Sequence, residues 1–124
     1  SGVPVVSVWG TGSPRREFMY VDDLARACTH IMSLPRLCYE SNTEPMVSHI
    51  NVGTGEDISI EELANTIKRV VGYSGGINFD ASKPDGPPKK LMDNKKILGL
   101  GWSAKTSLEH GLRMSYANFI SREI

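Results

Sequence analysis

Two adjacent arginines and a tryptophan make the start of this 124-residue chain chemically distinctive. Trp9 ends a valine-rich segment, and Arg15 and Arg16 follow a Gly-Thr-Gly-Ser-Pro turn. A guanidinium on a loop just beyond a strand can hold two phosphate oxygens through paired, charge-assisted hydrogen bonds. By residue type alone, an arginine pair is more often solvated surface, and a tryptophan at a strand end more often packs in a core. The stretch predicts a charged, ligand-facing loop, with Arg16 as the strongest candidate.

A second polar cluster lies at residues 83–90, in the sequence Lys-Pro-Asp-Gly-Pro-Pro-Lys-Lys. Its three prolines and one glycine keep the stretch out of regular structure. Asp85, held in that stiff loop, can accept two hydrogen bonds from vicinal hydroxyls, although an aspartate before a glycine is also a common turn. The lysines, among them Lys90, can equally form an ordinary basic loop.

Asp22 and Asp23 form a carboxylate pair that could serve a metal ion or acid–base chemistry. Their place at the start of an amphipathic segment favours helix capping instead. His49 has no Cys, His or carboxylate at metal-ligand spacing, so we expect no metal site. Two Gly-Thr-Gly stretches, at residues 10–12 and 53–55, continue without a third glycine and indicate tight turns more than dinucleotide sites.

The segments that must position these side chains follow an α/β pattern. We predict short strands over residues 3–9, 50–52 and 77–79. Helices are predicted from Asp22 or Asp23 to Leu34, over residues 60–71 and 94–98, and from Thr106 onward, with residues 37–45 as a loop. The pattern amounts to about three short strands and three or four helices.

Capping signals support two of these helices. Ser59 with Glu62, and Thr106 with Glu109, have the spacing of a capping box, and Gly72 follows the end of the helix over 60–71. The first helix carries apolar residues on one face, which we expect to be buried: Leu24, Ala27, Cys28 and Ile31.

The overall charge excludes some partners. Fourteen basic and fourteen acidic residues give a formal net charge of zero, so no global field attracts nucleic acid or an anionic membrane. Any anion site must therefore be local. Two cysteines, with no secretory h-region and no long apolar span, favour a reducing, cytoplasmic setting over a disulfide scaffold.

Three stretches of the chain resemble one family: residues 8–25, 48–55 and 79–86. They are similar to the nucleotide-sugar-modifying branch of the extended short-chain dehydrogenases, and within it to the GDP-L-fucose synthases. The resemblance implies that residues 1–124 are the C-terminal, nucleotide-sugar-binding portion of such an enzyme. It also implies that most of the Rossmann half is missing.

The family converts GDP-4-keto-6-deoxy-mannose by 3,5-epimerisation and NADPH-dependent 4-reduction. The resemblance implies that Trp9 lies against the nucleotide, Arg16 contacts the GDP diphosphate, Asp85 binds the ribose and Lys90 makes a further nucleotide contact. The family position of Arg15 tolerates uncharged residues, so we expect Arg15 to be a surface residue.

The family's catalytic Tyr and Lys, spaced four apart, have no counterpart in this chain. The residues four after its tyrosines are Leu24, Thr43, Ile77 and Ile120. The Gly-rich turn that holds a pyrophosphate is also lacking. We therefore expect NADP to bind a missing N-terminal part, no catalytic residue or cofactor site here, and no activity from this chain alone.

The partners implied are a GDP-sugar, the N-terminal half of the same enzyme and, at full length, a second copy in a homodimer. Two alternatives stay open: another nucleotide-sugar epimerase or dehydratase, and a non-catalytic sugar-nucleotide-binding module. By resemblance, the first helix and the strand at 50–52 pack on the missing domain. We therefore expect an exposed apolar face.

Overall fold

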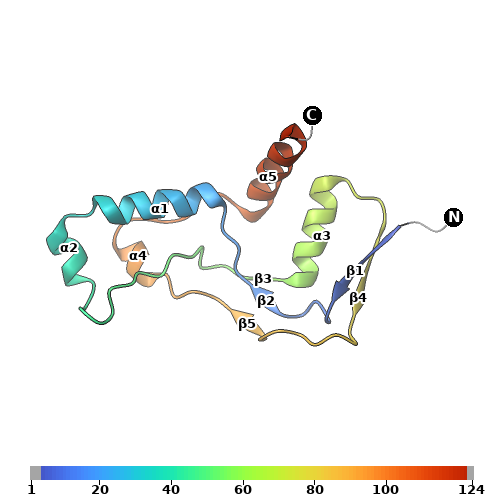
Figure 1. Cartoon of the computed structure of the whole chain (residues 1–124), viewed down its shortest axis with the longest axis horizontal. Coiled ribbons are helices and arrows are strands. Elements are labelled where there is room, and N and C mark those ends of the chain that lie inside the picture. Colours follow the sequence, from blue (N-terminus) through green and yellow to red (C-terminus); the bar gives the residue numbers. More distant parts are fainter. Residues whose placement is uncertain (1–3, 123–124) are drawn as a thin grey trace.

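The structure, a computed structural model, describes residues 4–122 and confirms the α/β class. It is elongated, with the N-terminal strand at one end and helix α2 at the other (Figure 1). In chain order its elements are β1 (Val5–Trp9), β2 (Arg15–Arg16), α1 (Val21–Ser33), α2 (Arg36–Ser41), β3 (Ile58–Ser59), α3 (Ile60–Val71), β4 (Gly76–Asp80), β5 (Lys89–Lys90), α4 (Lys95–Gly99) and α5 (Leu108–Arg122).

Strands β1 and β4 form a two-stranded parallel sheet. Trp9 pairs with Asp80 at its end, and the Gly10 N–H donates to the Asp80 carbonyl at 3.0 Å. The predicted start of the first strand, Val3, lies outside the described residues. Because both strands end at the same edge, Trp9 lies beside the loop that carries Asp85.

The three two-residue strands form a second sheet, here called the ribbon, in the order β3-β2-β5. Strand β2 runs parallel to β5, so that Arg15 pairs with Lys89 and Arg16 with Lys90. Successive residues of a strand point to opposite faces. Arg15 and Lys89 therefore share one face of the ribbon, and Arg16 and Lys90 share the other. Strands this short have little stability of their own, so side-chain contacts must hold them together.

Helix α3 has the predicted boundaries. The capping box is confirmed, because Ser59 Oγ accepts the Glu62 N–H at 3.1 Å and the Glu62 carboxylate accepts the Ser59 N–H at 3.0 Å. The helix ends at Gly72, whose φ of 70° is in the left-handed region. Helix α5 packs beside α3 (Figure 1), where Arg69 donates to Glu109 at 2.9 Å.

Two predictions of secondary structure are wrong. Helix α2 occupies much of the stretch 37–45 that was predicted to be a loop, and the Pro35 carbonyl accepts the N–H groups of its first turn. Residues 50–52 do not form a strand, although Ile50 and Val52 pack against the apolar core. Helix α4 does confirm the short helix predicted over 94–98.

The capping box predicted for the last helix is also wrong. Helix α5 begins at Leu108, and the Ser107 hydroxyl accepts the His110 N–H at 3.4 Å. Thr106 instead donates its N–H to Asp23, and Glu109 pairs with arginines. Tertiary contacts of Thr106 and Glu109 thus replace the local contacts that their spacing predicted.

The capping role predicted for Asp22 or Asp23 is wrong as well. Helix α1 follows Tyr20, and its first turn has no side-chain cap. The Asp23 carboxylate is 1 % exposed, and it accepts hydrogen bonds from Arg26 at 2.6 Å and from the Lys105 and Thr106 N–H groups at 3.2 and 2.8 Å. Burial alone would raise the pKa of Asp23, but these hydrogen bonds outweigh it and lower the pKa to about 2.

The apolar core of the described residues is small. Ala27, Ile97 and Trp102 are its buried members, so it joins α1 to α4 and to the segment after α4. His30 adds a polar contact there, with Nε2 2.8 Å from the Leu100 carbonyl oxygen. Within residues 4–122, no helix is both long and apolar enough to cross a membrane.

Helix α1 has an exposed apolar face that adjoins the face packed on this core. The prediction that Leu24 and Cys28 are buried is wrong, since both are exposed, whereas Ala27 is buried and Ile31 is half-buried as expected. Val21 and Met32 extend the exposed face and are 67 % and 86 % exposed. The spacing of these residues places them along one side of the helix.

Asp23→Ala should lower the free energy of unfolding by about 3 kcal/mol, because the N–H groups of Lys105 and Thr106 and the Arg26 guanidinium lose the charged acceptor that they share. The folded-state pKa lies below the ordinary value, so ionised Asp23 stabilises the fold above about pH 4. Up to about 2 kcal/mol of that stability should be lost as the pH falls through 4 to 2. Urea unfolding of the wild type and Asp23→Asn at pH 6 and pH 2.5 measures the effect, and the difference between them should shrink at low pH.

Asp22→Ala is the matched control, because Asp22 lies in the same helical turn and is exposed. It should change the free energy of unfolding by less than about 1 kcal/mol, the size of a helix-dipole effect. Equal losses from the two substitutions would contradict the role assigned to Asp23.

The exposed face of α1 should make the isolated 124-residue chain self-associate. Leu24→Glu and Met32→Lys place charges in that face and should shift sedimentation toward monomer. Leu37→Glu changes a side chain that is 80 % exposed on α2, outside this face, and should have no such effect. A wild-type chain that stays monomeric at high concentration and binds no hydrophobic dye would refute the prediction.

Candidate functional site

One small cavity brings together three of the four predicted site residues. It measures about 100 Å³ and is lined by Trp9, Gly12, Pro14, Arg16, Ile60, Pro84, Asp85 and Gly86. Its walls come from the end of β1, from β2, from the start of α3 and from the proline-rich loop before β5. Side chains more than 70 residues apart in the sequence therefore meet at one place.

The Asp85 carboxylate is held by the turn after β1. Thr11 donates its N–H to Oδ1 at 2.9 Å and its hydroxyl to Oδ2 at 2.6 Å. The Thr11 hydroxyl bond, followed by the Thr11 N–H bond, holds the pKa of Asp85 below its ordinary value. Gly10, with φ of 90°, permits this approach, because a Cβ there would collide with the Asp85 carboxylate. Two bonds leave the ionised carboxylate able to accept more.

The Arg16 guanidinium is fixed by backbone carbonyls. Its Nη1 donates to the Arg15 and Pro87 carbonyl oxygens, both at 2.7 Å. No carboxylate pairs with Arg16 in the part of the chain that the structure describes. The guanidinium therefore keeps its charge and further donors for an anion.

Trp9 is 75 % exposed, so the alternative that it packs in the core is wrong. Lys83 Nζ lies 5.7 Å from the centroid of its ring, a cation–π contact. An exposed contact of this kind is worth only about 0.5–1 kcal/mol. An aromatic ligand could therefore displace Lys83 or use the ring's other face.

Lys90 does not line the cavity. It is exposed on β5, beside Arg16 and on the same face of the ribbon. The two residues are cross-strand neighbours on strands whose backbones lie about 4.8 Å apart. Lys90 thus adds positive charge next to the cavity without forming its wall.

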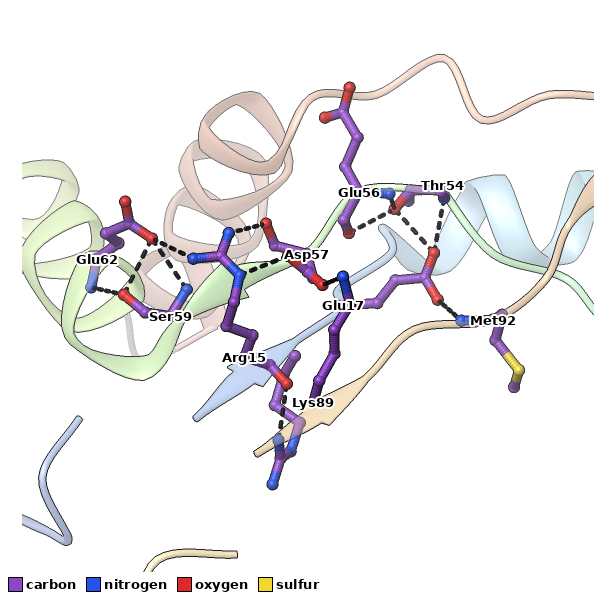
Figure 2. A network of polar contacts seen from close by, with 11 residues as sticks. Arg15, Glu17, Thr54, Glu56, Asp57, Ser59, Glu62, Lys89 and Met92 are labelled. Atoms are coloured by element: carbon purple, nitrogen blue, oxygen red, sulfur yellow. Dashed lines mark hydrogen bonds and ion pairs between the residues drawn. The ribbon is translucent and has the colours of Figure 1, made fainter. Parts of the chain in front are cut away.

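Arg15 was predicted to be a surface residue, and its side chain is 43 % exposed, but the prediction missed its ion pairs. Figure 2 shows it in a polar network: Nε donates to Asp57 Oδ1 at 2.6 Å, Nη2 donates to the Asp57 carbonyl at 2.9 Å, and Nη1 lies 3.6 Å from Glu62. Its hydrogen bond to Asp57 raises the pKa of Arg15. Lys89 also pairs with Asp57.

The sequence prediction missed Glu17, which joins three segments (Figure 2). Its carboxylate accepts the Gly55 N–H at 2.7 Å, the Thr54 hydroxyl at 3.1 Å and the Met92 N–H at 3.1 Å. An acidic residue between Arg16 and an apolar segment was the only signal in the sequence, and it pointed to no partner.

Neither Gly-Thr-Gly turn fits the pyrophosphate of a dinucleotide. The Gly55 N–H is taken by Glu17, and the Thr11 N–H is taken by Asp85. Each turn thus gives to a carboxylate of the chain the N–H group that a pyrophosphate would need. Among the described residues, no group of three or more His, Cys, Asp or Glu side chains is placed to hold a metal ion.

The chain is similar to known proteins over nearly its whole length. Residues 2–53 match the model of the NAD dependent epimerase/dehydratase family. The GDP-L-fucose synthase of Escherichia coli (strain K12) is 53 % identical over 97 % of the chain. The chain spans only 37 % of that relative's length.

Two solved structures have a similar fold. A GDP-6-OMe-4-keto-L-xylo-heptose reductase from C. jejuni has a TM-score of 0.85 and 39 % identity, over 95 % of this chain and 34 % of that one. A GDP-L-fucose synthetase from Naegleria fowleri bound to NADP has a TM-score of 0.79 and 30 % identity, over 96 % and 35 %. The resemblance seen in the sequence is confirmed: over nearly its whole length, this chain is homologous to about one third of a GDP-L-fucose synthase and has the α/β fold of extended short-chain dehydrogenases and epimerases.

Proposed function

We propose that this chain binds the nucleotide end of a GDP-sugar. It would do so as the nucleotide-sugar-binding portion of an enzyme that converts GDP-4-keto-6-deoxy-mannose to GDP-L-fucose by epimerisation and NADPH-dependent reduction. The observation that carries the proposal is the meeting of Trp9, Arg16 and Asp85 at one cavity. Similarity to GDP-L-fucose synthases supports the choice of a GDP-sugar.

The chemistry of each residue suits one part of a nucleotide. Trp9 offers an exposed aromatic face for stacking. Arg16 offers fixed guanidinium donors to the diphosphate, with the Lys90 charge beside it. Asp85 offers carboxylate oxygens to the ribose hydroxyls. The cavity is smaller than the roughly 300–1,000 Å³ of most small-molecule sites, so it suits a phosphate or a ribose rather than a whole nucleotide.

NADP is the cofactor of the whole enzyme in this proposal. The family match and the NADP-bound relative support it. The chain's own turns do not fit a dinucleotide, so the cofactor and the catalytic Tyr–Lys pair are assigned to sequence outside these 124 residues. The N-terminal half as partner, a homodimer at full length and a cytoplasmic location belong to the same proposal.

A second candidate within the enzyme class differs only in the sugar. Trp9, Arg16 and Asp85 contact the nucleotide end in this proposal and leave the sugar ring unspecified. The structural likeness to a GDP-heptose reductase favours this alternative specifically. Turnover of GDP-4-keto-6-deoxy-mannose against a GDP-4-keto-heptose by the full-length protein separates the two. A binding module without catalysis would turn over neither.

Arg16→Met and Asp85→Ala should each weaken GDP binding roughly ten- to a hundredfold, because each removes a hydrogen bond to or from a charged group. Calorimetric titration with GDP, in the full-length protein, measures the effect. Affinity for NADPH should not change, since the cofactor site lies elsewhere in this proposal.

The control for these variants is Arg36→Met, which removes a guanidinium that is exposed on α2. Arg15→Met is unsuitable because Arg15 belongs to the network of Figure 2. GDP affinity that falls equally with Arg36→Met, or NADPH binding lost while GDP binding persists, would show that the phosphate site is misplaced.

Thr11→Val should raise the pKa of Asp85 toward its ordinary value, because the hydroxyl bond to the ionised carboxylate is lost. The side-chain carbonyl shift of Asp85 in an NMR pH titration reports this directly. Ser13→Ala is the matched control: the Ser13 hydroxyl contacts the Thr11 hydroxyl at 2.7 Å but not Asp85. An Asp85 titration unchanged by Thr11→Val would contradict the assignment.

A further inference from the structure

We propose that Asp57 is a positioning residue for the phosphate-binding cations, and that it holds Arg16 and Lys90 in place from the opposite face of the ribbon. The inference rests on the proposed function, since it concerns the same nucleotide site. Asp57 lies just before β3, outside the cavity that contains Trp9 and Asp85, and has no role in the resemblance.

Asp57 joins two strands through their side chains. Its carboxylate is only 8 % exposed, with Oδ1 accepting from Arg15 Nε at 2.6 Å and Oδ2 lying 2.9 Å from Lys89 Nζ (Figure 2). The Lys89 contact is an ion pair outside hydrogen-bond geometry. The pKa of Asp57 is held below its ordinary value by the Arg15 hydrogen bond and then by Lys89, so the carboxylate is ionised at neutral pH.

Backbone contacts link Arg15, which Asp57 holds, to the Arg16 guanidinium on the other face of the ribbon. Arg15 on β2 donates its N–H to the Pro88 carbonyl at 2.8 Å. The carbonyl of the neighbouring Pro87 and that of Arg15 itself are the two acceptors that fix the Arg16 guanidinium. Lys90 follows Lys89 directly. The two residues that Asp57 holds are therefore the chain neighbours of the two cations that face the nucleotide.

The charges of the ribbon also support this role of Asp57. The ribbon contains two cross-strand pairs of cations, Arg15 with Lys89 and Arg16 with Lys90. Like charges opposite each other on neighbouring strands destabilise a sheet. Asp57 offsets the positive charge on one face and leaves the other face free to meet a diphosphate. Glu62 approaches Arg15 at 3.6 Å, but it is 60 % exposed and has no contact with Lys89.

The test compares GDP with guanosine, which lacks the phosphates, in NMR titrations of the full-length protein. Asp57→Asn should weaken GDP binding about tenfold, the effect of losing one charge-assisted hydrogen bond to the diphosphate. Affinity for guanosine should stay within about twofold, because stacking and ribose contacts do not depend on the ribbon cations. Glu62→Gln is the matched control: it removes a nearby negative charge, keeps a capping-box side chain and should leave GDP affinity within about twofold.

Several results would overturn the inference. Unchanged or tighter GDP binding by Asp57→Asn would show that Asp57 does not position the cations, and equal losses for GDP and guanosine would show a general loss of structure. If the wild type binds GDP and Arg16→Met does not, but Asp57→Asn is normal, only this inference fails. If the wild type does not bind GDP, the proposed function fails first.

Lys89→Met provides a second route if Asp57→Asn does not fold, because the Lys89 side chain is 57 % exposed. It should weaken GDP binding severalfold and leave guanosine binding unchanged. In the double variant, the effects of Asp57→Asn and Lys89→Met should overlap rather than add, since both break one contact. Additive effects would mean that Lys89 contacts the phosphates itself, and would overturn the inference.

Discussion

The Asp57 carboxylate meets cations from two strands that the sequence separates by more than 70 residues, and the ribbon depends on that meeting. Strands of two residues cannot hold a register by backbone hydrogen bonds alone. The same device recurs elsewhere in the molecule. Glu17 ties the turn at residues 53–55 to Met92, Asp23 ties α1 to the segment before α5, and Asp85 ties its loop to Thr11. Few apolar side chains are buried, so these carboxylate contacts stabilise much of the fold. Asp23 is buried, Glu17 and Asp57 are half-buried, and Asp85 is exposed.

These contacts explain which features could be predicted from the sequence. The helix over residues 60–71 was predictable in class and extent, because its capping box and its terminal glycine are local signals. The roles of Asp23 and Arg15 were not, because each depends on a partner more than 40 residues away. The sequence predicted Thr106 as the cap of the last helix, but the Ser107 hydroxyl takes that place and the Thr106 N–H donates to Asp23. The prediction that Cys28 is buried was wrong for a related reason. Helical periodicity identifies an apolar face, but it does not show whether another segment covers that face.

The candidate site shows the same division. Trp9, Arg16 and Asp85 were chosen by residue type and resemblance, and the structure places all three around one cavity. The sequence did not identify three further residues, Thr11, Glu17 and Asp57. None of them lines the cavity, and each contacts a distant part of the chain. Both Gly-Thr-Gly turns use a backbone N–H to hold a carboxylate. Turns that resemble phosphate cradles thus serve here to fix acidic side chains.

The long reach of these carboxylate contacts also bears on how the chain folds. The contacts of Asp57 with Arg15, of Asp85 with Thr11 and of Asp23 with Thr106 span 42, 74 and 83 residues. Closing each of those loops costs conformational entropy before its contact can stabilise the fold. Helix α3, whose signals are local, can form early, whereas the ribbon and the nucleotide cavity form only when distant segments have already met. High contact order slows folding at a given stability, so we expect the surface that we propose binds the nucleotide to form after helix α3.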